Sequence, residues 1–128
     1  MLNVPMPMKS DSGEPEIGLV QGIQPDSKNE WFMALALDKL KLNYIFQYQV
    51  DSPGVRGSQS IDFVVYSPYA KACFVQGAYW HNVRTQVEDQ LKHAAAEHYF
   101  GVGNVIDLSE EETASVEIAM NSIRKKIL

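Results

Sequence analysis

The sequence has one cysteine, three histidines and no hydrophobic run long enough to cross a bilayer. Because Cys73 has no second cysteine to pair with, an internal disulfide and a zinc site made of several thiolates are excluded. Basic residues are also few, 11 against 16 acidic ones, and the net charge of −5 disfavours a protein that coats nucleic acid by bulk attraction. A local basic face, or carboxylates that bind magnesium, is still compatible with this balance. The start MLNVPMPMKS lacks the pattern of a secretory signal, so we expect a cytoplasmic protein without membrane association.

Length and composition predict one folded domain with a loose start. The 128 residues suffice for one core, and 45% hydrophobic with 21% charged residues is typical of globular chains. Residues 1–26 are rich in Pro, Ser, Gly, Glu and Met without a sustained period, which predicts a flexible N-terminal arm. Apolar residues late in this arm would form a short strand or pack on the body, and the pattern leaves both open. We expect residues 27–128 to form the single domain, with the arm as a candidate docking segment.

Capping and periodicity predict the element order helix, three strands, helix, strand, helix. A capping box of Ser27 and Glu30 precedes a helix from Lys28 to about Lys41, and a second box at 109–112 precedes the last helix. The expected strands are 44–50, 61–66, 72–77 and 102–108, and a long Ala-rich helix over 84–100 is closed by Gly101. In the first strand, alternation places Tyr44, Phe46, Tyr48 and Val50 on one side. The result is an α/β (α+β) fold, a central mixed four-stranded sheet flanked by helices.

The second and third strands, IDFVVY and ACFVQG, flank SPYAK and predict a hairpin. With SPYAK as the loop, Phe74 lies opposite Val64 and Gln76 lies opposite Asp62. An acidic side chain in an apolar strand is costly unless it is paired, hydrogen-bonded or bound to a metal. Asp62 therefore either accepts hydrogen bonds from the GVRGSQS loop or belongs to a functional site.

A more specific signal is the order I-D-F-V-V, the hairpin, F-V-Q-G-A-Y-W-H, a helix that carries Asp89, and G-x-G-N-V-I-D-L. This order resembles the restriction-endonuclease-like PD-(D/E)xK superfamily. Within it, the chain is most similar to the very short patch repair endonucleases and related small nucleases, whose corresponding strand ends in a G-x-aromatic-Trp-His run. The resemblance runs from about Pro25 to the C-terminus, and Gly77 to His81 is its sharpest part. It implies a restriction-endonuclease-like fold and hydrolysis of DNA phosphodiesters with Mg²⁺ or Mn²⁺.

The resemblance implies a metal site made by Asp62, the backbone carbonyl of Val75 and Glu30. Asp62 matches the metal-binding Asp that opens the second core strand, and Glu30 matches the acid of the first helix. Magnesium prefers oxygen ligands and takes water for the remaining positions. Glu30 is also the residue that the capping box with Ser27 requires, and we give the two roles equal weight.

The chain departs from the superfamily at the E-x-K half of its motif. Phe74 and Gln76 stand where an acid and a Lys are usual, although the repair-endonuclease branch also has an apolar residue at the first position. Gln76 cannot act as a base at neutral pH, but its amide would orient water or a phosphate oxygen. The structural zinc of that branch is not expected, because Ala78 stands where the branch has a Cys.

His81 matches the catalytic His of the branch, and an imidazole that titrates near neutrality suits removal of a proton from water. Asp89 matches the acid that orients this imidazole, with Glu88 as an equally close choice. Simpler interpretations stay open. A lone His after two aromatic residues is more often packed or at the surface, and either acid can pair with Lys92 on a solvated helix face.

Contacts to DNA are expected from aromatic and basic side chains. Tyr79 and Trp80 would stack on bases or wedge between them, although aromatic residues at a strand end more often complete a core. A set of basic residues would either contact DNA phosphates or serve as ordinary solubilising charge: Lys39, Lys41, Arg56, Lys71, Arg84 and Lys92.

The sequence thus predicts a metal-dependent DNA endonuclease of nicking or repair type. A homodimer, a larger assembly built through the arm, and association with a virion stay open. The alternative is a catalytically degenerate nuclease fold that serves as a nucleic-acid-associated or assembly component of a phage or mobile element, favoured by the missing E-x-K side chains and the acidic balance. A third hypothesis is a helical adaptor whose stripe over 116–127 pairs with another chain, although such a stripe is more often core.

Overall fold

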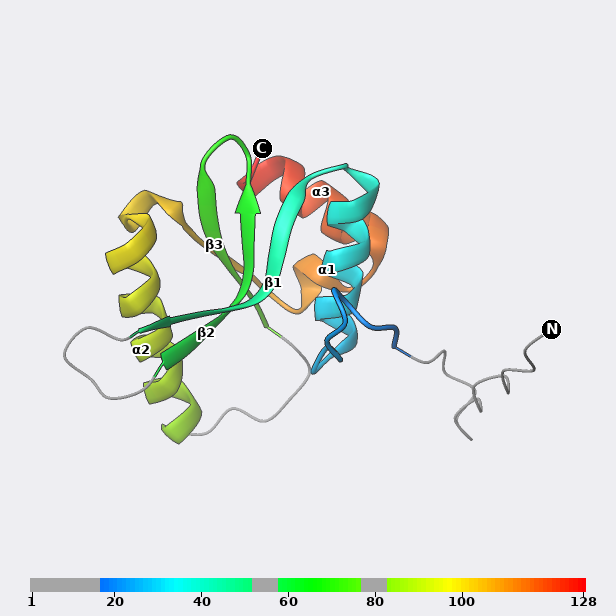
Figure 1. Cartoon of the computed structure of the whole chain (residues 1–128). Helices are drawn as coiled ribbons and strands as arrows, with labels where there is room; N and C mark the ends of the chain where they lie inside the picture. The colour runs from blue at the N-terminus through cyan, green and yellow to red at the C-terminus, as the bar shows by residue number, and fades with distance from the viewer. Residues whose placement is uncertain (1–16, 52–57, 77–82) are drawn as a thin grey trace, which may run out of the picture.

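A computed structural model describes residues 17–51, 58–76 and 83–128. These residues form a four-stranded sheet in the order β1-β2-β3-β4, in which β1, β2 and β3 are antiparallel neighbours and β4 runs parallel to β3. The elements are α1 (Lys28–Lys39), β1 (Asn43–Asp51), β2 (Ser58–Tyr66), β3 (Ala70–Val75), α2 (Val83–Phe100), η1 (Val102–Asn104), β4 (Val105–Leu108), η2 (Glu111–Thr113) and α3 (Val116–Lys126). The predicted α+β class, mixed sheet and element order are confirmed (Figure 1).

Helices cover both faces of the sheet (Figure 1). The larger part of the core lies between the sheet and the pair α1 and α3, where Leu37, Phe63 and Ile123 are fully buried. A smaller cluster lies beneath α2, where Ala96 packs with Val64. Because the apolar stripe of α3 is buried within the chain, it is core and not an exposed surface for a partner helix.

Helix α1 has the predicted N-cap and ends earlier than the predicted limit at Lys41. The Ser27 hydroxyl oxygen accepts the Glu30 N–H at 3.2 Å. At the other end Lys41 takes a left-handed backbone conformation with a φ of 58°, and the Leu42 N–H donates to the Leu37 carbonyl at 3.0 Å. These features define a Schellman motif, which closes the helix before Lys41 can join it.

Residues 17–26, which the sequence assigned to the arm, pack on the body where the structure describes them. Val20 is only 4% exposed and belongs to the main core. The Gln21 amide nitrogen donates to the Tyr44 carbonyl at 2.8 Å, and its side-chain oxygen accepts the Phe46 N–H at 2.9 Å. This segment therefore covers part of the outer edge of β1, which would otherwise present unpaired backbone groups.

The β2–β3 hairpin forms, but its predicted register was wrong by two residues. Val64 pairs with Ala72, not with Phe74, because Ala70 and Lys71 belong to β3 and the turn is shorter than SPYAK. A shift of two residues keeps every side chain on its predicted face, because faces alternate with a period of two. Asp62 and Phe74 therefore still lie on one face.

The predicted alternation of β1 was also wrong. Phe46 packs in the core beneath α1 and α3, whereas Val50 packs beneath α2, so they do not share a face. The reason is Gln47, which has a φ of 60° and interrupts the ladder opposite Asp62 while pairing continues on both sides. A left-handed residue inside a strand turns the side chains that follow it to the other face.

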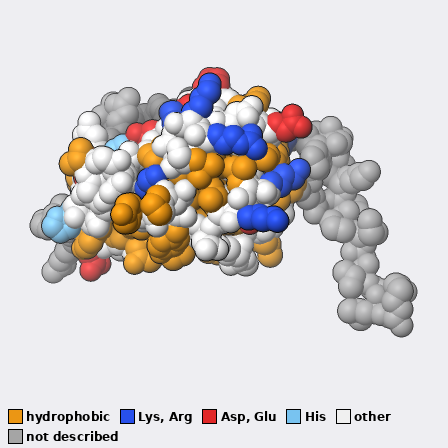
Figure 2. All heavy atoms as spheres, turned by 90° about the horizontal axis from the view of Figure 1, so that it is seen from above, with side chains coloured by type: hydrophobic (Ala, Val, Ile, Leu, Met, Phe, Trp, Pro, Cys, Tyr) orange, Lys and Arg blue, Asp and Glu red, His pale blue; other side chains and the backbone are white. Residues whose placement is uncertain are grey.

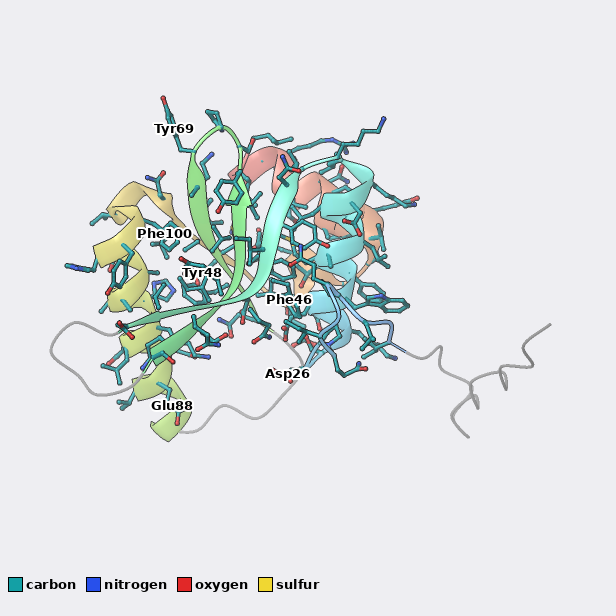
Figure 3. The ribbon with its side chains drawn as sticks, viewed as in Figure 1. Asp26, Phe46, Tyr48, Tyr69, Glu88 and Phe100 are labelled. Carbon is teal, nitrogen blue, oxygen red and sulfur yellow. The ribbon has the colours of Figure 1, made fainter. Side chains whose placement is uncertain are left out.

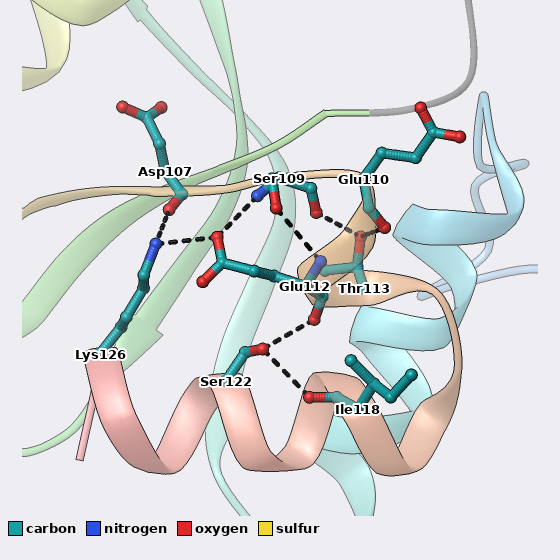
Figure 4. A network of polar contacts seen from close by, with 8 residues as sticks. All are labelled: Asp107, Ser109, Glu110, Glu112, Thr113, Ile118, Ser122 and Lys126. Carbon is teal, nitrogen blue, oxygen red and sulfur yellow. Dashed lines mark hydrogen bonds and ion pairs between the residues drawn. The ribbon is translucent and has the colours of Figure 1, made fainter.

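The second predicted capping box caps a single turn and not the last helix (Figure 4). The Glu112 N–H donates to the Ser109 hydroxyl oxygen at 3.2 Å, and the Ser109 N–H donates to a Glu112 carboxylate oxygen at 3.0 Å. This exchange closes the short η2 turn. Helix α3 begins at Val116 with Ser115 as its N-cap. Ser122 and Lys126 then tie α3 back to Glu112, at 2.8 Å in each case.

Candidate functional site

A cavity of about 350 Å³ lies at the end of the molecule where α1 begins and β3 ends. Its lining residues come from five separate segments: Asp26, Glu30, Asp62, Phe74, Val75, Glu88, Asp89, Lys92 and His93. Figure 3 labels Asp26 on the α1 side of this end and Glu88 on the α2 side. The fold therefore brings five of the residues predicted from sequence to one place: Asp62, Glu30, Val75, Asp89 and Lys92.

Asp62 lies in β2 where the ladder with β3 has ended. Paired residues run only from Tyr66–Ala70 to Phe63–Cys73, and beyond them a carboxylate oxygen of Asp62 accepts the Val75 N–H at 2.9 Å. Burial raises the pKa of Asp62 to about 6, although the Val75 N–H and the Lys92 ammonium favour its ionised form. The acid is thus held by β3, and not by the part of the GVRGSQS loop that the structure describes.

Glu30 takes part in the N-cap and also lines the cavity. Its backbone N–H is capped by Ser27, while its side chain is only 4% exposed and lines the cavity. The Gln47 amide nitrogen lies 3.4 Å from one carboxylate oxygen of Glu30. Burial, and then repulsion from the carboxylates of Asp62 and Asp26, raise the pKa of Glu30 to about 7.

Val75 also lines the cavity. Its N–H points at Asp62, and in an extended strand the N–H and C=O of one residue face the same edge. Gln76 follows directly, and its N–H donates to the Leu108 carbonyl at 2.9 Å. The structure places Gln76 outside the lining of the cavity.

Helix α2 supplies the other wall. Asp89, Lys92 and His93 lie three and four residues apart, so they share one face of the helix. The charge of Lys92 lowers the pKa values of both Asp62 and Glu30, which identifies it as the cation of the site.

Three lining residues were not predicted from sequence: Asp26, Phe74 as a wall residue, and His93. Asp26 was assigned to the arm, and Phe74 was taken only as a departure from the family motif. His93 follows Asp89 by four residues on a helix, and this spacing was the available signal. The His93 Nε2 lies 2.7 Å from Oδ1 of Asp107 in β4.

Several predicted residues lie elsewhere. Tyr79, Trp80, His81 and Arg56 are outside the described residues, and Arg84 is in the first turn of α2. Lys39 and Lys41 lie at the opposite end of α1 from the cavity. The Lys71 ammonium donates to the carbonyls of Ser67 at 2.8 Å and Ile127 at 2.6 Å, which ties the hairpin to the end of α3. From the end of the molecule that carries the hairpin turn, Lys and Arg side chains are interspersed with hydrophobic ones (Figure 2).

The donor chemistry of the cavity fits a magnesium-like ion. Five carboxylates line it together with one Lys and one His, and burial is the main reason why the pKa values of Glu30 and Asp62 are raised. No group of three or more His, Cys, Asp and Glu side chains within residues 17–51, 58–76 and 83–128 is arranged to hold an ion alone. Magnesium is commonly bound by one or two carboxylates together with water and phosphate oxygens, so such a group is not required.

Comparisons of the chain with protein-family models, with curated proteins and with solved structures found no match. Among the described residues, no helix has the length and apolar character needed to cross a membrane.

Proposed function

We propose that the chain is a magnesium-dependent endonuclease that hydrolyses DNA phosphodiesters on a restriction-endonuclease-like fold. The observation that carries the proposal is the convergence of Asp62, Glu30 and the Val75 backbone in one cavity, reached from three separate elements. These are the three groups that the family resemblance assigned to the metal. The three groups are far apart in the sequence and meet only because the chain folds in this way. Their convergence therefore supports the resemblance.

The chain itself would hold and orient the reactants. Asp62, Glu30 and the carbonyl of Val75 would hold the ion, with Asp89 nearby on α2. A bound magnesium ion supplies polarisation of the scissile phosphate and stabilises charge on the leaving oxygen. Lys92 would attract the phosphate group, and the Val75 N–H holds one carboxylate oxygen of Asp62 in place at the cavity.

The cavity offers a candidate substitute for the missing Lys of the E-x-K pair. In the superfamily pattern an acid and a Lys from the third strand enter the site, and here Phe74 and Gln76 occupy those positions. Glu30 from α1 and Lys92 from α2 place a carboxylate and an ammonium at the same cavity from the helices on its two sides. Lys92 could thus take the place of the missing Lys, whereas Glu30 matches the separate acid of the first helix and does not replace the missing acid of the third strand.

Plasmid nicking tests the proposal. The purified chain should convert supercoiled plasmid to open circles in the presence of Mg²⁺ and should stop when the ion is chelated. Asp62→Asn should reduce the rate at least about 100-fold, because it removes a charge at the ion without changing the volume of the side chain. The matched control is Asp51→Asn, an exposed acid at the end of β1, which should keep the rate of the unaltered chain. Nicking without a divalent ion, or unchanged nicking by Asp62→Asn, would refute the proposal.

The second candidate is a non-catalytic assembly component with the same fold. It is favoured by the replacement of the E-x-K pair and by the net charge of −5. Calorimetry separates it from the first: the absence of heat on titration with Mg²⁺ or Mn²⁺, together with a stable complex with another protein, supports the assembly function.

A further inference from the structure

We infer that His93, oriented by Asp107, is the catalytic base of this site and takes the proton of the attacking water. The inference rests on the proposed function and adds a residue that the family resemblance does not supply. His81 was the only imidazole singled out by the sequence.

The position of His93 is fixed from two sides. Its Nε2 lies 2.7 Å from Asp107 Oδ1, and its ring stacks on Phe74 with ring centroids 5.0 Å apart and an interplanar angle of 23°. Phe74 and Asp107 are register partners in the β3–β4 ladder, so both contacts come from neighbouring positions of one rigid sheet. The imidazole is therefore held at the wall of the cavity that Asp62 and Glu30 also line.

The contact with Asp107 determines which nitrogen is basic. An ionised carboxylate only accepts hydrogen bonds, so the neutral ring carries its proton on Nε2 and keeps the lone pair on Nδ1. This is the arrangement in which a carboxylate fixes the tautomer of a general base. Asp107 is thus a positioning residue, and Nδ1 is the proton acceptor.

In the proposed hydrolysis step, each proton and each electron pair has a defined destination. The water oxygen forms a bond to phosphorus as one of its protons passes to Nδ1, and the bond from phosphorus to the leaving nucleotide oxygen breaks with its electron pair on that oxygen. The leaving oxygen takes a proton from solvent, and the imidazolium returns its own proton to solvent. The net reaction adds one water across the phosphodiester.

A surface ion pair without function is the simpler account of the same contact, since the two side chains are 38% and 49% exposed. Two observations favour the functional role. His93 lines the cavity that holds the buried acids, and its ring is stacked on an aromatic wall residue. His98, also on α2, packs instead against Tyr99 and does not line the cavity, which makes it a matched control.

The test compares single substitutions of the chain's three histidines in the plasmid assay. We expect His93→Gln to lower the rate about 100- to 10,000-fold, the range for loss of a general base, while His98→Gln keeps the rate. Free imidazole should restore part of the rate of His93→Ala, at least about tenfold, because it can fill the space and accept the proton. Asp107→Asn should lower the rate and should move the ring proton of His93 from Nε2 to Nδ1, as read from ring ¹⁵N shifts.

The outcomes separate this inference from the proposed function. If the unaltered chain nicks DNA and His93→Gln stays within threefold of it, His93 is not the base although the nuclease stands. Loss confined to His81→Gln would assign the base to that residue and overturn the inference. Absence of nicking by the unaltered chain at every divalent ion tested would overturn both. Melting curves for each variant exclude loss of the fold as the cause.

Discussion

Replacing Glu30 by Gln should make the metal-free protein more stable at pH 8 while it removes the proposed activity. Glu30 is buried beside other carboxylates, and its pKa rises from 4.5 to about 7 on folding. A carboxyl group with a raised pKa binds a proton in the folded chain at a pH where the unfolded chain has released it, so stability falls as pH rises from about 4.5 to about 7. Above pH 7 the full cost of the buried charge is present.

The size of the effect follows from the same values. The difference between 4.5 and about 7 corresponds to about 3 kcal/mol, which solvent at the open cavity reduces to about 2 kcal/mol. Glu30→Gln keeps the backbone N–H that Ser27 caps and removes the charge. At pH 8 we expect the free energy of unfolding of the variant to exceed that of the unaltered chain by about 2 kcal/mol, which corresponds to a rise of roughly 8 °C in the thermal midpoint. Near pH 4.5 the two free energies of unfolding should be equal.

Urea unfolding with chelator at pH 8 and at pH 4.5 measures this difference directly. The matched control is Glu117→Gln, an exposed acid in α3, which should change stability by less than about 0.5 kcal/mol at both pH values. Mg²⁺ should stabilise the unaltered chain at pH 8 much more than it stabilises Glu30→Gln. A variant that is less stable than the unaltered chain at pH 8, or an advantage that persists unchanged at pH 4.5, would refute the electrostatic account of the cavity.

Two further predictions concern backbone positions with positive φ. Gln47 has a φ of 60° inside β1, so Gln47→Gly should be about 1 kcal/mol more stable than Gln47→Ala in urea unfolding, the reverse of the usual order in a strand. If Gln47→Ala is the more stable variant, the backbone at this position is not left-handed. Lys41 has a φ of 58° at the end of α1, far from the cavity, so Lys41→Gly should raise stability by about 1 kcal/mol without changing the nicking rate. A destabilised Lys41→Gly chain would contradict the Schellman ending of this helix.

The architecture was predictable because capping residues and periodicity are local signals. Ser27 is the N-cap of α1 as predicted, and the hydrophobic periodicity of each segment predicted the order of helices and strands. The errors arose where one residue overrides a pattern. The sequence of β1 does not indicate that the backbone of Gln47 is left-handed. The Ser109–Glu112 box closes a short turn and not the last helix, because Ser115 offers a second N-cap a few residues later.

The site was predictable in part, for a related reason. Asp62 was recognisable because an acid in an apolar strand demands a partner. Its partner, the Val75 N–H, depends on where the β2–β3 ladder stops, and local sequence does not give that position. The His93–Asp107 contact joins a helix to a strand that follows it, so it becomes visible only when α2 is placed on the sheet.

A crystal grown or soaked with Mn²⁺ tests whether the cavity binds a metal, because anomalous scattering locates the ion without any assay of activity. We expect one strong peak in the cavity, within bonding distance of an Asp62 carboxylate oxygen and of the Val75 carbonyl oxygen, and we expect no such peak in Asp62→Asn. A cavity without such a peak at millimolar Mn²⁺, or a peak that is unchanged in Asp62→Asn, would contradict this expectation.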